Sequence, residues 1–118
     1  MKFFGIVKKH LGRGTKLGFP TANIPAPANL ADATYLAIVN SNTVSYYSIV
    51  FIGSPATFDE TDRRAEAYLL NFSGDLYDQE IEIEIIKKLR DNKKFDSEAA
   101  LIDQMKEDES EARKFFSL

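Results

Sequence analysis

The stretch Glu80-Ile81-Glu82-Ile83-Glu84-Ile85 alternates charged and apolar residues with a period of two. That period is typical of a β-strand with one buried face and one solvated face. We expect the three isoleucines to face a core and the three glutamates to face water. The acidic run is therefore interpreted as a solvated face and is not nominated for catalysis.

Shorter runs with β character precede this strand in the chain. They cover residues 2–8, 35–40, 44–52 and 65–72, and they are rich in β-branched and aromatic side chains. Turn residues between the second and third runs predict a hairpin, and Ser73-Gly74-Asp75 predicts a tight turn after the fourth. The polar run 59–64 holds no core-forming residue and is interpreted as a loop that could act as a lid.

From Asp96 the hydrophobic period becomes helical. Asp96 can cap the first turn, and Glu98 suits the positive end of the helix dipole. An apolar stripe at helical spacing is interpreted as core packing and not as a cofactor site; it consists of Leu101, Ile102, Met105, Ala112, Phe115 and Phe116. Short strands followed by one helix predict a small antiparallel barrel or folded sheet, covered by the helix on one side.

Length and composition predict one soluble domain spanning residues 1–118. Hydrophobic residues make up 44% and charged residues 28% of the chain, which is ordinary for a globular protein. The absence of cysteine excludes thiol chemistry, and the lack of a long apolar window predicts a cytoplasmic protein without a membrane partner. A net charge of −3 argues against nucleic acid as a partner.

The segment 12–24 combines the features of a phosphate and metal site. Its glycines let backbone N–H groups approach an anion closely, and its basic residues add positive charge; these are Gly12, Arg13, Gly14, Lys16 and Gly18. The spacing matches neither a Walker A loop nor a dinucleotide-binding fingerprint. A surface loop between strands, with a solvated basic strand end, is the alternative interpretation of these residues.

Two oxygen-bearing side chains follow the loop. Pro20 favours an extended backbone around it, so Thr21 and Asn23, two residues apart, point to the same side. Hydroxyl and amide oxygens are hard ligands that suit Mg²⁺. The segment therefore predicts a magnesium ion beside bound phosphate.

The run Gly-x-Gly-x-x-Leu-Gly-Phe-Pro-Thr-Ala-Asn-Ile, residues 12–24, resembles the nucleotide-binding segment of the riboflavin kinase (flavokinase) family, including the C-terminal kinase domain of bacterial bifunctional riboflavin kinase/FMN adenylyltransferase. The resemblance continues in order and spacing along nearly the whole chain. It includes Gly53–Phe58, Ala65–Leu70, Phe72–Tyr77, Leu89-Arg90, Lys94–Ser97 and the helix positions Gln104, Asp108, Ala112 and Arg113.

The resemblance implies a mainly β fold, a six-stranded antiparallel Greek-key barrel with a C-terminal α-helix. It also implies transfer of the γ-phosphoryl group of ATP to the 5′-hydroxyl of riboflavin, giving FMN, with Mg²⁺ as cofactor. By resemblance the nucleotide-binding residues are Gly12, Arg13, Gly14, Thr15, Lys16, Gly18, Pro20 and Thr21, the metal ligands are Thr21 and Asn23, the catalytic base is Glu66, and the flavin-binding residues are Leu89, Arg90 and Phe95.

Glu66 shares its predicted strand face with Tyr68, Leu70 and Phe72, where partial desolvation would raise the pKa of the carboxyl. Without the resemblance, a carboxylate at a strand end near Arg63 or Arg64 would be the favoured interpretation. The expected partners are riboflavin or FMN and ATP or ADP, and the expected state is a monomer. Because the chain has no room for an adenylyltransferase domain, we expect the product to stop at FMN.

Several positions depart from the family pattern, and they sustain an alternative function. Phe51 stands where asparagine is usual, Tyr68 stands where histidine is common, and Ala33-Thr34 and Pro55-Ala56 also differ. The alternative is a flavin- or nucleotide-binding homologue with weakened catalysis. Joint retention of Thr21, Asn23 and Glu66 favours the enzyme, since a binding module has no use for a base.

Overall fold

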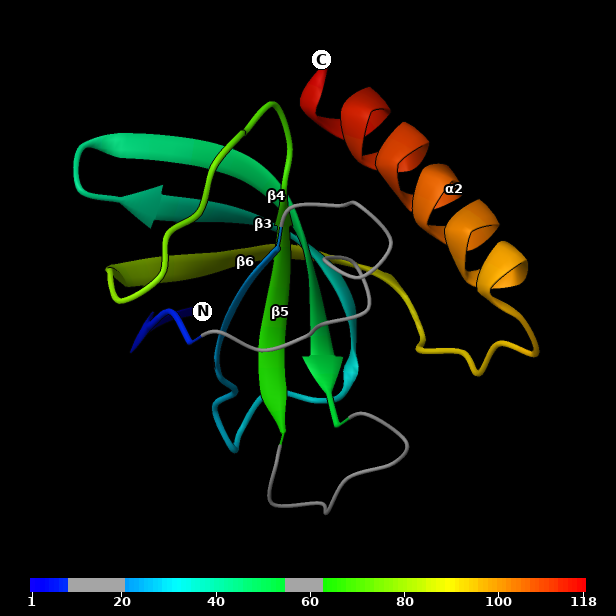
Figure 1. Ribbon diagram of the computed structural model, residues 1–118, viewed down its shortest axis with the longest axis horizontal. Coiled ribbons are helices and arrows are strands. Elements are labelled where there is room, and N and C mark those ends of the chain that lie inside the picture. Colours follow the sequence, from blue (N-terminus) through cyan, green and yellow to red (C-terminus); the bar gives the residue numbers. More distant parts are fainter. Residues whose placement is uncertain (9–20, 55–62) are drawn as a thin grey trace.

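Six strands form one antiparallel sheet in the computed structural model, which describes residues 1–8, 21–54 and 63–118. The elements are β1 (Lys2–Ile6), β2 (Thr21–Pro25), β3 (Ala33–Ser41), β4 (Val44–Gly53), β5 (Arg64–Leu69), β6 (Glu80–Arg90) and helix α2 (Glu98–Phe116). The order across the sheet is β1-β6-β3-β4-β5-β2. The sheet curls into a barrel, and α2 lies outside it (Figure 1).

The two end strands of the sheet meet and nearly close the barrel. An isolated antiparallel bridge pairs Lys8 with Asn23, and the Lys8 amide donates to the Asn23 carbonyl at 2.9 Å. The seam is tight because a Cβ placed on Gly5 of β1 would lie 2.7 Å from the Cβ of Ile24 on β2. Glycine is therefore required for this close approach. The predicted six-stranded barrel with a terminal helix is confirmed.

The barrel interior is filled by apolar side chains that alternate along the strands. On β6 the isoleucines Ile81 and Ile83 are at most 1% exposed, as the period-two pattern predicts. Glu80 is exposed, whereas Glu82 and Glu84 are half-buried on the outer face. The Glu82 Oε1 atom accepts from the Asn40 Nδ2 atom at 2.8 Å. The acidic run thus faces outward, and part of it is engaged by a neighbouring strand.

A second, smaller apolar cluster lies outside the barrel and joins the sheet to α2. Its buried members are Leu36, Ile49, Leu70 and Ala112, with Tyr68, Leu89 and Phe116 packed around them. The expected helical stripe therefore contributes Ala112 and Phe116 to packing. Phe115 is 45% exposed, so the expectation that this residue belongs to the core is wrong.

Helix α2 has well-formed caps at both ends. Ser97 is the N-cap, since its side chain accepts from the Ala100 amide at 3.1 Å. The prediction that Asp96 caps the helix is wrong by one residue, because only Ser97 places its hydroxyl on that amide. At the other end Ser117 takes a left-handed conformation, with φ of 59°, and its amide reaches the last-turn carbonyls.

The strand ends that differ most from the sequence-based expectation are those of β5 and β6. Strand β5 ends at Leu69, because Asn71 has a positive φ of 56° and turns the chain away. At the predicted tight turn, Ser73–Asp75, the chain bends at Gly74, which has a positive φ of 104°, but this bend lies within a longer connection over residues 70–79 that has turns near its two ends. Strand β6 runs on to Arg90, well past the alternating stretch, because it continues to pair with β3. The β3–β4 hairpin is confirmed.

Within the described parts of the chain, no helix is both long and apolar enough to cross a membrane.

The polar run 59–64 lies mostly outside the described residues, so the expectation of a lid there stays a prediction. Arg63, which is described, anchors the start of β5. Its guanidinium contacts Asp32 at 2.6 Å and donates to the carbonyls of Pro27 and Leu30.

Candidate functional site

A row of paired residues crosses the outer face of the barrel from β2 to β6. In register, Asn23 lies opposite Glu66, Glu66 opposite Phe51, Phe51 opposite Thr34, and Thr34 opposite Arg90. Directly paired residues of antiparallel strands project to the same face, about 5 Å apart. Residues from five strands are thus gathered in one line on the side of the barrel that α2 covers.

Asn23 is buried in an unusual way. Its side chain is 1% exposed, and no donor from the described residues reaches its Oδ1 atom. A buried carbonyl oxygen without a partner carries a desolvation cost of about 1–3 kcal/mol, so an oxygen kept in this state suits a ligand that the site receives. Thr21 lies two residues earlier on the same face of β2.

These two oxygens fit a magnesium ion. Mg²⁺ is usually bound through few protein oxygens, with phosphate and water completing the octahedron. The residues described here contain no group of three or more histidine, cysteine, aspartate or glutamate side chains placed to hold a metal. A site built on Thr21 and Asn23 would therefore depend on oxygens of the bound nucleotide.

Glu66 lies in the middle of β5, not at a strand end. It is half-buried, with Asn23 on one side and Phe51 on the other. Of the two arginines near it in sequence, Arg63 is committed to Asp32 and two backbone carbonyls. The structure therefore brings the expected base next to an expected metal ligand. The expected rise in the pKa of Glu66 stays a prediction.

Tyr68 connects the same strand to α2. Its hydroxyl donates to the Glu109 Oε1 atom at 2.7 Å, and the Glu109 Oε2 atom accepts from the Arg113 Nε atom at 2.9 Å. Both terminal nitrogens of Arg113 lie 3.2 Å from the Asn71 Oδ1 atom. The contacts form a ring from β5 to the helix and back to the segment that follows β5.

Burial and hydrogen bonding shift the pKa values of Tyr68 and Glu109 in opposite directions. Burial, together with the hydrogen bond and the negative charge of Glu109, raises the pKa of Tyr68 to about 12. Burial of Glu109 acts to raise its pKa, but hydrogen bonds from Tyr68 and Arg113 outweigh that effect and hold this pKa below its ordinary value. At neutral pH the phenol therefore donates to a carboxylate, which is a charge-assisted hydrogen bond.

The residues expected to contact flavin lie where β6 gives way to α2. Leu89 packs in the outer apolar cluster, and Phe95 is half-buried in the following loop. Arg90 binds Asp108 of α2 through two contacts of 2.8 Å, and Gln104 donates to the same carboxylate at 3.0 Å. Arg90 is thus held by the helix, and its assignment to flavin stays a prediction.

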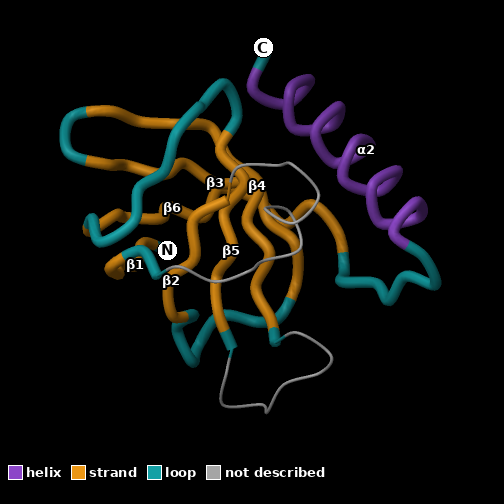
Figure 2. Tube along the Cα trace, in the orientation of Figure 1, coloured by secondary structure: helices purple, strands orange, loops and turns teal. Residues whose placement is uncertain are grey.

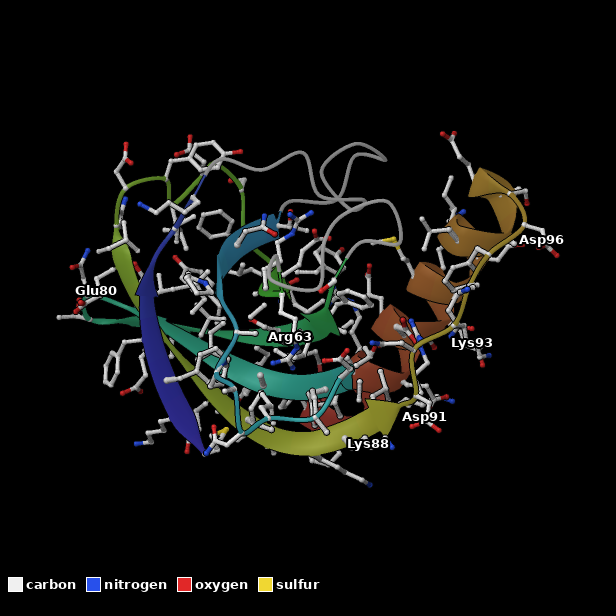
Figure 3. All side chains as sticks on the ribbon, turned by 90° about the horizontal axis from the view of Figure 1, so that it is seen from below. Arg63, Glu80, Lys88, Asp91, Lys93 and Asp96 are labelled. Carbon is white, nitrogen blue, oxygen red and sulfur yellow. The ribbon has the colours of Figure 1, made fainter. Side chains whose placement is uncertain are left out.

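Figure 3 shows Lys88, Asp91, Lys93 and Asp96 in succession along the path from β6 to α2, at the end of β6 opposite Glu80. Lys88 and Asp91 form an exposed ion pair, and the Lys93 Nζ atom donates to Gln104 at 3.1 Å. The first half of the loop is therefore tied to β6 and to α2, and Figure 2 shows the loop leading away from the barrel and α2 running back toward it.

Most of the expected nucleotide-binding residues lie outside the described residues; these are Gly12, Arg13, Gly14, Thr15, Lys16, Gly18 and Pro20.

Two residues that contribute contacts to the outer face were not predicted from the sequence. Asn92 accepts from the Thr34 hydroxyl and donates to the Ile52 carbonyl, both at 3.0 Å. No pattern indicated Asn92. Glu109 could have been noticed as part of the consecutive pair Asp108-Glu109 inside an amphipathic helix.

Comparison with known proteins defines the class to which this barrel belongs. The model of the flavokinase family, described as riboflavin kinase, matches residues 1–116. The chain therefore belongs to the riboflavin kinase (flavokinase) family, as its motifs had suggested. Human riboflavin kinase is 34% identical over 124 aligned positions, covering 97% of this chain and 79% of that protein.

Two bacterial relatives are longer proteins. The trifunctional protein RibF/MnmA of Mycoplasmoides gallisepticum is 36% identical to this chain. The match covers 95% of this chain and 18% of that protein. The RNA-binding riboflavin kinase RibR of Bacillus subtilis is 34% identical to this chain. The match covers 97% of this chain and 50% of that protein. The chain thus spans half or less of these two relatives. Because RibR is named as RNA-binding, the expected absence of a nucleic-acid partner stays a prediction.

Solved structures share the fold. Riboflavin kinase from Trypanosoma brucei superposes with a TM-score of 0.66 at 25% identity, covering 98% of this chain and 79% of that one. A Streptococcus pneumoniae protein named as a macrolide-efflux protein superposes with a TM-score of 0.83 at 31% identity, covering 95% of this chain and 38% of its own. The barrel with its terminal helix is therefore a riboflavin kinase-like fold.

Proposed function

We propose that this protein is an ATP-dependent riboflavin kinase, which phosphorylates the 5′-hydroxyl of riboflavin to give FMN. The observation that carries the proposal is the pairing of Asn23 with Glu66. A buried amide oxygen without a described partner lies directly across the sheet from a half-buried carboxylate. A metal ligand beside a carboxylate that can accept a proton suits the transfer of a phosphoryl group to a hydroxyl.

Thr21 and Asn23 would hold Mg²⁺, which when bound neutralises charge on the nucleotide phosphates. Glu66 would accept the proton of the riboflavin 5′-hydroxyl as that oxygen attacks the γ-phosphorus. The bond from the γ-phosphorus to the bridging oxygen breaks, and ADP leaves. Because the transition state of phosphoryl transfer is loose, positioning by the protein contributes more than the base does.

The same proposal covers the ligands and setting expected from the sequence. Family membership supports ATP as the phosphoryl donor and flavin as the acceptor. We propose that residues 12–16, 18, 20 and 21 bind the nucleotide, that Leu89, Arg90 and Phe95 bind flavin, and that the protein acts as a cytoplasmic monomer. Arg90 could serve flavin only from the position that Asp108 gives it.

A flavin- or nucleotide-binding homologue with weakened catalysis is the second candidate. The position of Phe51 favours it, because an aromatic ring pairs directly with Glu66 across β5 and β4. Phe51 stands where asparagine is usual in the family, and an aromatic ring cannot hydrogen-bond a carboxylate as an amide can. This candidate predicts ligand binding without measurable turnover.

One incubation separates the two candidates. The purified chain is mixed with riboflavin, ATP and Mg²⁺, and FMN and FAD are followed by chromatography with fluorescence detection. We expect FMN to accumulate, with no FAD. Binding of riboflavin and MgADP without FMN would support the second candidate. Formation of FAD would show that the chain has a second, adenylyl-transferring activity.

A further inference from the structure

Two consecutive acidic residues of α2 hold two separate strands of the barrel. Asp108 binds Arg90 of β6, and Glu109 accepts from the hydroxyl of Tyr68 on β5. The strands β6 and β5 are not neighbours, because β3 and β4 lie between them in the sheet. At one level of the helix, two neighbouring residues therefore hold two strands that do not pair with each other.

The two fastenings meet different parts of the candidate site. Arg90 ends the row that begins with Asn23 and Glu66. Tyr68 pairs with Thr21 in register and follows Glu66 by two residues on the same face. One fastening thus lies on the side proposed for flavin, and the other lies on the side proposed for the metal and base.

We propose that Tyr68 is a positioning residue, whose hydrogen bond to Glu109 fixes the metal-and-base side of the site relative to the helix that borders the flavin side. The proposal rests on the proposed kinase function. It adds a residue whose role is to keep the acceptor hydroxyl of riboflavin aligned with Glu66 and the γ-phosphate, without itself touching the reacting atoms.

The geometry suits such a role better than simple attachment. Glu109 is held from its other side by Arg113, and Arg113 reaches Asn71 just beyond β5. Tyr68 therefore contacts an acceptor that is itself fixed, which limits movement of the phenol and of the strand beneath it. The ion pair of Arg90 with Asp108 already attaches the helix to the barrel, and Asp108 is buried, with 5% of its surface exposed.

Kinetics of three variants test the proposal. Tyr68→Phe removes only the hydroxyl, Glu109→Ala removes its acceptor, and the double variant removes both. Small losses of alignment can lower the rate of an enzymatic step by up to about 100-fold, so we expect kcat to fall about tenfold in each variant. The KM for MgATP should stay within about twofold. The double variant should match the single ones, because the two residues act through one contact.

The control is Glu111→Gln on the same helix, where the carboxylate is exposed and lies 3.9 Å from the Lys114 Nζ atom. This variant should keep the parental kcat. Thermal unfolding of all variants separates a positioning role from loss of stability. A well-folded Tyr68→Phe with kcat within twofold of an active parent overturns the positioning role and leaves the kinase function standing. Additive losses in the double variant also overturn it. An inactive parent overturns the kinase function itself.

Discussion

The two faces of strand β5 are built on different principles. The inward residues Ala65, Ala67 and Leu69 are at most 2% exposed and belong to the apolar core of the barrel interior. The outward residues Glu66 and Tyr68 are half-buried, polar, and paired with the metal-ligand candidates of β2. One strand therefore carries the core on one side and the candidate site on the other.

The difference teaches how this small barrel separates stability from function. Interior packing is tolerant of identity but sensitive to volume, since apolar contacts are not directional. The outer face depends on directed contacts, such as the 2.7 Å hydrogen bond from Tyr68 to Glu109 and the paired 2.8 Å contacts of Arg90 with Asp108. Substitutions on the two faces should thus affect different measurements.

The largest expected effect is on the outer face, at Glu66. Glu66→Gln keeps the shape of the side chain but cannot accept a proton. A positioned base contributes about 10²- to 10⁴-fold, and we expect the low end for kcat because phosphoryl transfer needs less help from a base. FMN formation is the measurement, and the midpoint of thermal unfolding is its control.

A Glu66→Gln variant that turns over within about threefold of the parent would contradict the base assignment, since that loss is too small for a missing base. The mechanism would then rest on positioning alone. A loss of activity accompanied by a large drop in unfolding midpoint would instead assign Glu66 to the stability of the fold, which would erase the contrast between the two faces.

The interior should respond in the opposite way. Ile83 is fully buried in the barrel, whereas Ile86, three residues later on the same strand, is 41% exposed. Ile83→Ala leaves a cavity and should lower the free energy of unfolding by about 2–5 kcal/mol. Ile86→Ala should lower it by less than about 1 kcal/mol, because little apolar area is lost. Urea unfolding measures both free energies. Equal losses would show that Ile86 on the outer surface contributes as much to stability as Ile83 in the barrel interior.

Asn23 is a buried residue whose substitution should change ligand affinity much more than stability. Asn23→Ala removes a buried oxygen that no described donor reaches, so its cost in stability should be small, about 1 kcal/mol or less. Affinity for MgADP should fall by about tenfold or more, since even loss of a residue that supports a metal ligand typically costs 10- to 100-fold. Calorimetric titration with MgADP measures the loss. Unchanged affinity in a folded variant would remove the metal assignment.

The interior could be predicted from the sequence because its signal is local. Alternation in residues 80–85 gave the inward face of β6 correctly, and the turn residues after Asn40 gave the β3–β4 hairpin. The continuation of β6 to Arg90 was not predictable, because Lys87 and Lys88 have little β propensity and end the alternating pattern. Pairing with β3 and cover by α2 outweigh that propensity.

The outer face could be predicted only in part. Family motifs named Thr21, Asn23 and Glu66, but the pairing of Asn23 with Glu66 is a matter of strand register between distant segments. The bond from Tyr68 to Glu109 joins residues 41 apart in sequence, and no period in the sequence indicates it. Directed contacts of this kind depend on the packed position of α2, which propensities do not determine.

The smallest expected effect concerns the start of α2, where the sequence and the structure name different caps. The Ser97 side chain accepts from the Ala100 amide at 3.1 Å, so Ser97→Ala should lower the free energy of unfolding by about 1 kcal/mol. Asp96→Ala, at the cap predicted from the sequence, should cost only a few tenths of that because Asp96 lies outside the helix. Neither substitution reaches the contacts of Asp108 and Glu109, which hold the helix more than two turns further on, so FMN formation should be unchanged in both.

Urea unfolding of the two variants side by side decides between the caps. A larger loss for Asp96→Ala would place the helix start one residue earlier, whereas a loss of FMN formation in Ser97→Ala would show that the outer face depends on the whole helix and not only on its two fastened residues.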